Sequence, residues 1–406
     1  MTSTNLSYLQ SNRPLRICLV NRTDICGGAE VVAQDQLREF TARGYEVKLL
    51  VGEKRCKDPR VIEIPKSDNN DFNYSAWHTA LMDADVVHFH NLHGDYFDRG
   101  MIRDLSRDKV VVATLHDQYL FTGGCVHTRG CERWTSGCGS CPQVDQNSKV
   151  DRTADQWSQK KQLFSASRLH VIAPARWIYD RALKSLLAAD EVTIHRIPNG
   201  VDTQIFHPNA SHALRSIHGL PANQPLLLTV AQGILRNPSK DWDLLDTALR
   251  LLASSLCAPV TVIVLGDEHP DIVYSNVRIR FLGTVRDWRE MAAWYSAADI
   301  YVHVSRAETF CLAILEAMAS GCAVLSTAVG GVQEQLEPES EGDATCGIVV
   351  ETVNPRNLSE ALLRLINNPQ HWVTLSAAAI ERVNRKWALT HHVDTHLALY
   401  QMHSPS

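Results

Sequence analysis

The pattern that most constrains the fold is an alternation of short apolar runs with helix-like stretches, which occurs twice along the 406-residue chain. The first series predicts strands at 15–20, 46–51, 85–90, 109–115 and 169–174, and helices at 31–43 and 75–82. Strands that are apolar throughout and alternate with helices are typical of a parallel sheet covered on both faces. The first half of the chain is therefore expected to form one doubly wound domain.

A second series of the same kind follows in the other half of the chain. It predicts strands at 226–231, 260–266, 277–283, 300–304 and 323–327, and helices at 243–256, 288–298 and 312–320. Between the two series, residues 198–225 are rich in Pro, Asn, Ser and His and lack a long period, which indicates a domain boundary. We therefore predict an α/β protein with two Rossmann-like doubly wound domains, 1–205 and 206–387, that face a central cleft.

Composition argues against several other classes of protein. The chain is 45% hydrophobic and 21% charged, which disfavours disorder, collagen and coiled coil. Its formal net charge of −5 disfavours a general nucleic-acid binder. No apolar run approaches the roughly 18 residues that span a bilayer, and the start is polar rather than signal-like, so we expect a cytoplasmic protein whose eleven cysteines are mostly reduced.

A short basic cluster offers one route to a membrane surface. Lys54, Arg55, Lys57 and Arg60 lie close together in the first predicted domain. Such a patch could make a peripheral contact with the inner face of the membrane, although a solvated loop is the favoured interpretation.

The most informative chemistry lies between residues 305 and 324. A loop carrying Glu308 leads into a helix that begins near Cys311 and contains Glu316. A helix N-terminus suits a phosphate, and two carboxylates at different heights can bind hydroxyl groups on either side of it. The alternative is a solvated loop acid and an exposed helical acid, but Glu316 lies in a nearly apolar helix, where an acid is expected to be paired or bound.

These residues belong to a longer pattern that resembles a known family. Glu308 and Glu316 are followed by Ala-Met-Ala-Ser-Gly at 317–321 and Gly-Gly-Val-Gln-Glu at 330–334. This resembles the nucleotide-sugar signature of family 4 glycosyltransferases, which are retaining enzymes of the GT-B fold. Pro-Asn-Gly-Val-Asp at 198–202 and Gly-Gly-Ala at 27–29 match further motifs of that family, in the same order along nearly the whole chain.

The resemblance implies the reaction and its partners. A sugar would pass from a nucleotide-diphosphate donor, such as a UDP- or GDP-sugar, to a hydroxyl of a glycan or lipid-linked saccharide, in polysaccharide biosynthesis. Family members generally need no metal for catalysis, because protein cations stabilise the leaving diphosphate. In the GT-B fold the last helix returns to the first domain, so residues 388–406 are assigned there.

The resemblance also implies a donor site. Glu308 would contact the donor sugar, Glu316 the ribose, and the backbone N–H groups of Phe310, Cys311 and Leu312 the diphosphate. Lys240 would bind the diphosphate, with Arg236 as an accompanying cation. Cys311 and Asp241 stand where the family often has Gly.

Two glycines after the first strand are assigned to the same site. Gly27 and Gly28 could let the backbone approach the donor phosphate or the acceptor, although most glycine pairs only form turns.

Histidines at strand ends mark the acceptor side. His116 and Asp117 directly follow the strand at 109–115, where ligands bind in such sheets. The resemblance makes His116 a catalytic residue together with Glu308 and Lys240, and Asp117 an orienting or acceptor-side residue. His90 and Asn91 are expected on the acceptor side as well. His88 and His90 share one strand face, which matches a metal-ligand spacing, but hydrogen-bonded histidines are the commoner case.

Four cysteines lie within the segment 121–143. Cys125, Cys131, Cys138 and Cys141 have the spacing Cys-x5-Cys-x6-Cys-x2-Cys, with glycines between them. Four thiolates suit a tetrahedral zinc ion, which would be structural rather than catalytic. Because only the last two form a Cys-x2-Cys pair, two disulfides or four free thiols are the alternatives. A similar insert occurs in family 4 enzymes that build polysaccharides, and its position after His116 places it on the acceptor side.

Rival functions are also open. A GT-B-fold epimerase would convert a nucleotide sugar without an acceptor, and a phosphorylase would need a pyridoxal lysine that the sequence does not indicate. A catalytically silent nucleotide-sugar-binding or scaffold protein is the rival of another class, because Cys311 and Asp241 depart from the family pattern.

Overall fold

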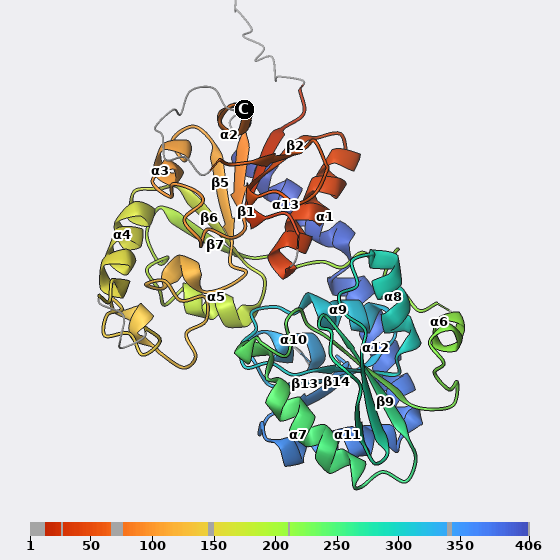
Figure 1. The fold of residues 1–406 in the computed structure, drawn as a ribbon. Helices are drawn as coiled ribbons and strands as arrows, with labels where there is room; N and C mark the ends of the chain where they lie inside the picture. Colours follow the sequence, from red (N-terminus) through yellow and green to blue (C-terminus); the bar gives the residue numbers. More distant parts are fainter. Residues whose placement is uncertain are drawn as a thin grey trace, which may run out of the picture.

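Two largely parallel sheets covered by helices form the core of the computed structural model, which describes residues 13–25, 27–65, 76–144, 150–209, 212–338 and 343–404 (Figure 1). The predicted pair of Rossmann-like domains is therefore confirmed. The first sheet has the order β3-β2-β1-β4-β5-β6-β7. Its strands are β1 (Arg16–Thr23), β2 (Glu46–Glu53), β3 (Val61–Glu63), β4 (Val86–Phe89), β5 (Val110–Thr114), β6 (Leu169–Ala173) and β7 (Val192–Arg196), and its helices are α1 (Gly28–Ala42), α2 (Ala76–Asp83), α3 (Met101–Leu105), α4 (Thr153–Ser165) and α5 (Arg176–Ala182).

The second sheet is also doubly wound, with the order β10-β11-β9-β8-β12-β13-β14. All its strand pairs are parallel except β10 with β11. Its strands are β8 (Leu226–Val230), β9 (Val260–Leu265), β10 (Ile272–Tyr274), β11 (Val277–Phe281), β12 (Ile300–His303), β13 (Ala323–Thr327) and β14 (Gly347–Val350), and its helices are α6 (His212–Ile217), α7 (Trp242–Ala253), α8 (Trp288–Ala297), α9 (Leu312–Ala319), α10 (Val332–Leu336), α11 (Pro355–Ile366) and α12 (Pro369–Lys386).

The strand order reverses at one point in each sheet, and these points position the site. Strand β1 lies between β2 and β4, and β8 lies between β9 and β12. The loops that leave neighbouring strands on opposite sides of such a switch point diverge, which opens a crevice at the carboxyl ends of the strands. The segments that follow β1, β4 and β5 in one domain and β8 and β12 in the other therefore surround the candidate site.

The sequence analysis did not predict four of the strands, and all four lie at the edges of the sheets. Strands β3, β7, β10 and β14 stand at the ends of the two strand orders. They are short and only partly buried. The central strands β4, β5, β9, β12 and β13 are buried at every residue, which gives them the continuous apolar runs that the sequence analysis detects.

The last helix, α13 (Leu389–His403), packs on the first domain, and Figure 1 shows it in blue beside the red α1. Its Val393 and Tyr400 share a buried cluster with Leu37 of α1, and the rings of Phe40 and Tyr400 lie 5.7 Å apart. Before α13, a parallel bridge joins Val201 to Ala388, so the chain crosses between the domains twice at one place. Within the described ranges, no helix has both the length and the apolar character needed to cross a membrane.

A glycine makes this double crossing feasible. A Cβ atom added to Gly200 would lie 2.8 Å from the Cα atom of Leu389. A side chain at this position of the Pro-Asn-Gly-Val-Asp segment would therefore force apart the two segments that cross between the domains.

Candidate active site

An ion pair forms the centre of the site in the second domain. Lys240 lies on a 3-10 turn, Pro238–Lys240, after β8, and its Nζ is 3.2 Å from Oε2 of Glu308, on the loop after β12. The two loops are joined because the hydroxyl of Ser305 and the N–H of Arg306 both donate to the carbonyl of Ser239, each at 2.8 Å. The structure thus brings together two predicted catalytic residues that are far apart in sequence.

The surroundings keep this pair charged. Burial by itself would raise the pKa of Glu308, but Lys240 and the neighbouring His303 outweigh it and hold that pKa well below the usual range. Glu308 in turn raises the pKa of Lys240. At neutral pH the site therefore presents a fixed ammonium group beside a fixed carboxylate.

The same carboxylate belongs to a three-residue group with metal-ligand chemistry. Ligand atoms of His303, Glu308 and Cys311 all lie within 4.8 Å of one another. However, Lys240 contacts the same Oε2 that faces Nε2 of His303 at 3.6 Å. An ammonium group at this oxygen supplies the positive charge that a metal would bring, so the donor set fits an ion-pair network better than a cation site.

The start of α9 lies beside this pair. The N–H of Cys311 is bonded to Oε1 of Gln335, whose amide donates back to the carbonyl of Cys311. The predicted role of that N–H toward a diphosphate is therefore blocked in this conformation. In the described part of the chain the N–H groups of Phe310 and Leu312 have no acceptor, which leaves them available to an anion.

Two glycines of the 330–334 motif support the Glu308 loop. Gly330 has φ +53°, and a Cβ atom there would lie 1.7 Å from the carbonyl oxygen of Glu308. A Cβ atom on Gly331 would lie 2.4 Å from the carbonyl oxygen of Thr309. These glycines let the backbone pack directly under the loop that carries Glu308.

Glu334, the last residue of that motif, links the two domains. Its carboxylate accepts the N–H groups of Arg176 at 2.7 Å and Trp177 at 2.6 Å, at the start of α5. A carboxylate that caps a helix of the other domain stabilises the relative position of the domains. The sequence analysis did not assign this role, because the contact spans 158 positions of sequence.

Glu316 lies between the domains rather than on an exposed helix face. It is 8% exposed and lines a cavity of about 20 Å³ with Asp35 and Arg38 of α1. Burial raises its pKa to about 7, and the nearby Tyr295 hydroxyl offsets only part of this effect. Burial also raises the pKa of Asp35 to about 6. Asp35 and Arg38 were not predicted from the sequence, since on α1 they look like ordinary surface charges.

The loop after β1 meets this helix. Gly28 opens α1, and a Cβ atom on it would lie 3.8 Å from Cδ1 of Leu312. Gly27, the residue before the helix, has an extended backbone, and a Cβ atom there would lie 2.3 Å from the carboxylate of Glu30. The structure therefore places the predicted glycine pair against the start of α9.

Two residues near Lys240 in the sequence, Arg236 and Asp241, have surroundings of their own. Arg236 is exposed, and within the described ranges its side chain makes no hydrogen bond or ion pair, so the structure does not bring it to Lys240. Asp241 has φ +45°, a left-handed conformation that favours Gly, and its carboxylate is 2.5 Å from Arg306. This ion pair explains how Asp occupies a position where the family often has Gly.

The first domain contributes a column of histidines. Nδ1 of His90 and Nε2 of His116 are 2.9 Å apart, and the rings of His88 and His90 are stacked. The column continues into α13, where His396 stacks on His88 and lies beside His392. His90 is buried within this column, so it supports His116 and does not line an open cleft.

His116 is the partly buried end of the column. Burial lowers its pKa to about 3, so its ring is neutral at pH 7. The neighbouring Asp117 accepts the N–H of Tyr119 at 2.7 Å and lies 3.6 Å from Nε2 of His93, and burial raises its pKa to about 6. Asn91, which is half-buried, donates its N–H to the side chain of Asn21.

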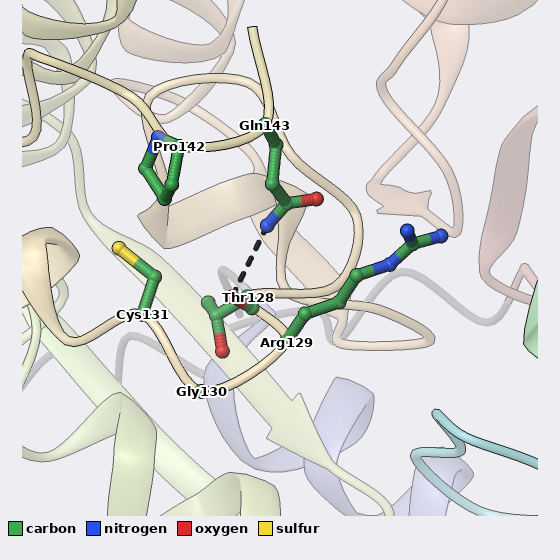
Figure 2. Close-up of a pocket in the computed structure, with 6 residues that line it drawn as sticks. All are labelled: Thr128, Arg129, Gly130, Cys131, Pro142 and Gln143. Carbon is green, nitrogen blue, oxygen red and sulfur yellow. Dashed lines mark hydrogen bonds between the residues drawn. The ribbon is translucent and has the colours of Figure 1, made fainter.

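The cysteine-rich segment faces the ion pair from the first domain. The charges of Glu308 and Lys240 act on the half-buried ring of His127, whose pKa is lowered by burial. Beside His127 is a pocket of about 710 Å³, which Figure 2 shows with Arg129 on one side and Cys131 and Pro142 on the other. The pocket is lined by Thr128, Arg129, Gly130, Cys131, Pro142 and Gln143.

Comparison with protein families matches each half of the chain separately. Residues 26–205 match the model described as Glycosyltransferase Family 4, and residues 224–368 match the model described as Glycosyl transferases group 1. Together the two matches cover both doubly wound domains.

Proteins of similar sequence are named as glycosyltransferases. The chain is 29% identical over 233 residues to D-inositol 3-phosphate glycosyltransferase 1 of Catenulispora acidiphila, and this match spans about half of each chain, 54%. It is 25% identical over 417 residues to D-inositol 3-phosphate glycosyltransferase of Mycolicibacterium smegmatis, covering 93% of this chain and 87% of the relative. It is 26% identical over 269 residues to a protein of Escherichia coli provisionally named colanic acid biosynthesis glycosyl transferase WcaC, covering 62% of each.

Solved structures share the fold over nearly the whole chain. Sucrose-phosphate synthase from Thermosynechococcus elongatus superposes with a TM-score of 0.67 at 18% identity, covering 96% of this chain and 99% of that one. Anabaena HepE, crystallised with UDP and glucose, superposes with a TM-score of 0.67 at 16% identity, covering 95% and 99%. At this identity the likeness describes the GT-B arrangement of the two domains.

Proposed function

Because this chain belongs to glycosyltransferase family 4, we propose that it transfers a sugar from a nucleotide-diphosphate donor to a hydroxyl group of a glycan or lipid-linked saccharide, with retention of configuration. The observation that carries this proposal is the partly buried ion pair of Lys240 and Glu308 near the start of α9. It supplies one cation for a leaving diphosphate and one carboxylate for the hydroxyls of the sugar.

The chemistry follows from where charge grows during transfer. As the bond to the sugar breaks, negative charge develops on the diphosphate, and a fixed ammonium group stabilises it without reorganisation. Lys240 supplies that group, and the free N–H groups of Phe310 and Leu312 add the positive end of a helix. These groups serve the purpose that a metal ion serves elsewhere, so a metal is not required for this step.

Retention is proposed to occur by front-face attack. The acceptor hydroxyl would attack on the face from which the diphosphate departs, and the departing phosphate oxygen would take the proton. His116, neutral and partly buried at its strand end, is proposed to stabilise the donor sugar on the opposite side. Glu316, buried between the domains, is proposed to bind the ribose.

The donor base is the first point to test. The solved neighbour HepE was crystallised with UDP, which makes UDP the first nucleotide to examine here. A ligand that binds only the native state raises the melting temperature. We expect one of UDP, GDP or ADP to stabilise the purified protein, and Glu316→Ala to lose that shift while Arg236→Ala keeps it.

The stereochemical result and the silent alternative need separate measurements. The anomeric configuration of the product by NMR would match the donor if transfer is retaining, and inversion would contradict the mechanism. Nucleotide binding without any transfer or donor hydrolysis, across a panel of glycan acceptors, would favour a silent binding protein. The occupied N–H of Cys311 is the feature that favours this second candidate.

A further inference from the structure

The four cysteines of the segment 121–143 surround one small cavity. Cys125, Cys131, Cys138 and Cys141 all line a space of about 20 Å³, which has room for a single atom-sized occupant. All four are free thiols and are partly buried. Thiols separated along the chain are thus gathered around one point by the fold.

The backbone here takes conformations that need support. Apart from two 3-10 turns, Tyr119–Phe121 and Arg133–Thr135, residues 115–144 have no regular secondary structure. Arg129, Cys138 and Ser140 have φ of +49°, +54° and +45°, which is half of the non-glycine left-handed residues in the described chain. Such conformations persist only where the surroundings impose them.

We propose that Cys125, Cys131, Cys138 and Cys141 bind one structural zinc ion that holds this segment in place. Four cysteine ligands form the closed, tetrahedral shell typical of structural zinc. The binding free energy of such a site becomes folding free energy for the segment around it. This proposal does not depend on the glycosyl-transfer reaction.

Groups around the cysteines suit the charge of such a centre. Zinc with four thiolates carries a net negative charge, which nearby cations and N–H donors stabilise. The N–H of Gly123 donates to Sγ of Cys138 at 3.2 Å. Arg133 lines the cavity and donates to the carbonyl of Gly139 at 3.0 Å. The buried amine of Lys160 donates to the carbonyl of Thr122 at 2.9 Å, three residues before Cys125.

Zinc binding requires the sulfur atoms to turn inward. Zn–S bonds of about 2.3 Å in a tetrahedron place the sulfurs about 3.8 Å apart. In the described part of the chain, the group with three ligand atoms within 4.8 Å is His303, Glu308 and Cys311, not the cysteines. The cysteines line the cavity without having closed on its centre, so metal binding would tighten the segment.

This tightening would act on the pocket opposite the ion pair. Cys131 lines both the cavity and the 710 Å³ pocket, as do Pro142 and Gln143 (Figure 2). The amide of Gln143 donates to the carbonyls of His127 at 2.9 Å and Thr128 at 3.1 Å. A metal that joins 125–131 to 138–141 would therefore hold the two walls of that pocket together.

The decisive measurement is the metal content of the full chain. We expect elemental mass spectrometry of protein purified without chelator to find about one zinc per chain. Cys138→Ser should lose most of this zinc, whereas Cys257→Ser, at an exposed thiol outside the segment, should keep it. Cobalt exchanged into the wild type should show the intense visible absorption of a tetrahedral thiolate centre.

Further measurements keep the proposal open to refutation if Cys138→Ser does not fold. Removing the metal from the wild type with a chelator should speed proteolytic cleavage within 121–143, and added zinc should reverse this. Wild-type protein without zinc, with either four rapidly reacting thiols or two mapped disulfides in this segment, would overturn the proposal. Nucleotide binding is measured separately, so its failure would bear on the proposed reaction and not on the metal.

Discussion

The two domains are both doubly wound and each reverses its strand order at one point, but they present different electrostatics there. In the second domain, Lys240 and Glu308 form an ion pair in which each residue stabilises the charged form of the other. In the first domain, the corresponding edge carries His90 and His116, whose pKa values are lowered by burial so that both rings are neutral at pH 7. Two domains of similar fold therefore present fixed charge on one side and neutral polar groups on the other, because side chains at the strand ends and not the sheet determine the chemistry.

The largest effect is expected from removing the charge of the second domain. Lys240→Ala should lower kcat by about 10²–10³-fold, since one preorganised group that stabilises developing charge typically contributes that much. Turnover of the donor found by thermal shift measures this, with Lys184→Ala, an exposed lysine, as control. Unchanged turnover in a folded Lys240→Ala protein would remove the proposed role of the ion pair.

The next prediction tests whether the close packing of Gly330 under the Glu308 loop keeps the ion pair in place. Gly330→Ala should destabilise the protein by about 1–3 kcal/mol more than Gly219→Ala and should weaken nucleotide binding, because its Cβ would displace the Glu308 loop. Both glycines have positive φ, but Gly219 has no atom within 4 Å of an added Cβ, so it reports the backbone cost alone. Equal losses in urea unfolding would show that the contact with Glu308 is unimportant.

Acid should weaken the histidine column of the first domain. Burial lowers the pKa of His392 to about 4 from an ordinary 6.5, so its stabilising contribution is complete above pH about 6.5 and is lost as the pH falls toward 4. Within that window each such histidine contributes a slope of about 1.4 kcal/mol per pH unit.

A single variant isolates this slope from other titrating groups. Buried carboxyls such as Glu316 and Asp117, whose pKa values are raised, have the opposite dependence on pH. The difference in unfolding free energy between wild type and His392→Gln should therefore shrink from pH 7.5 to pH 5. A constant difference over this range would mean that His392 is not held neutral by the fold.

The smallest effect concerns the carboxylate between the domains. Because the pKa of Glu316 is raised to about 7, its ionised form, the stronger acceptor for ribose hydroxyls, becomes dominant above that pH. Nucleotide affinity by calorimetry should rise a few-fold from pH 6 to pH 8 in the wild type. Glu316→Gln should flatten this profile, and a profile that is unchanged in the variant would assign the pH dependence elsewhere.

Most strands of the two sheets were predicted from the sequence, and the strands that were missed all lie at sheet edges. Central strands such as β5 and β12 are buried on both faces, so their sequences are apolar without interruption and were found. The edge strand β7 has exposed positions and carries no such run, and the edge strand β14 is apolar but only four residues long. In the site, the motif residues Glu308 and Lys240 were predicted, whereas Asp35, Arg38 and Glu334 were not. Asp35 and Arg38 line a cavity with Glu316 of the other domain, and Glu334 accepts an N–H from the other domain.

The sequence by itself determined the two doubly wound domains and the family, because hydrophobic period and motif spacing are local properties of the chain. Only the tertiary structure decided which charges meet. It paired Lys240 with Glu308, gave Gln335 the N–H of Cys311, and buried Glu316 between the domains. Pairing and burial depend on neighbours distant in sequence, and these neighbours set the charge state of each group.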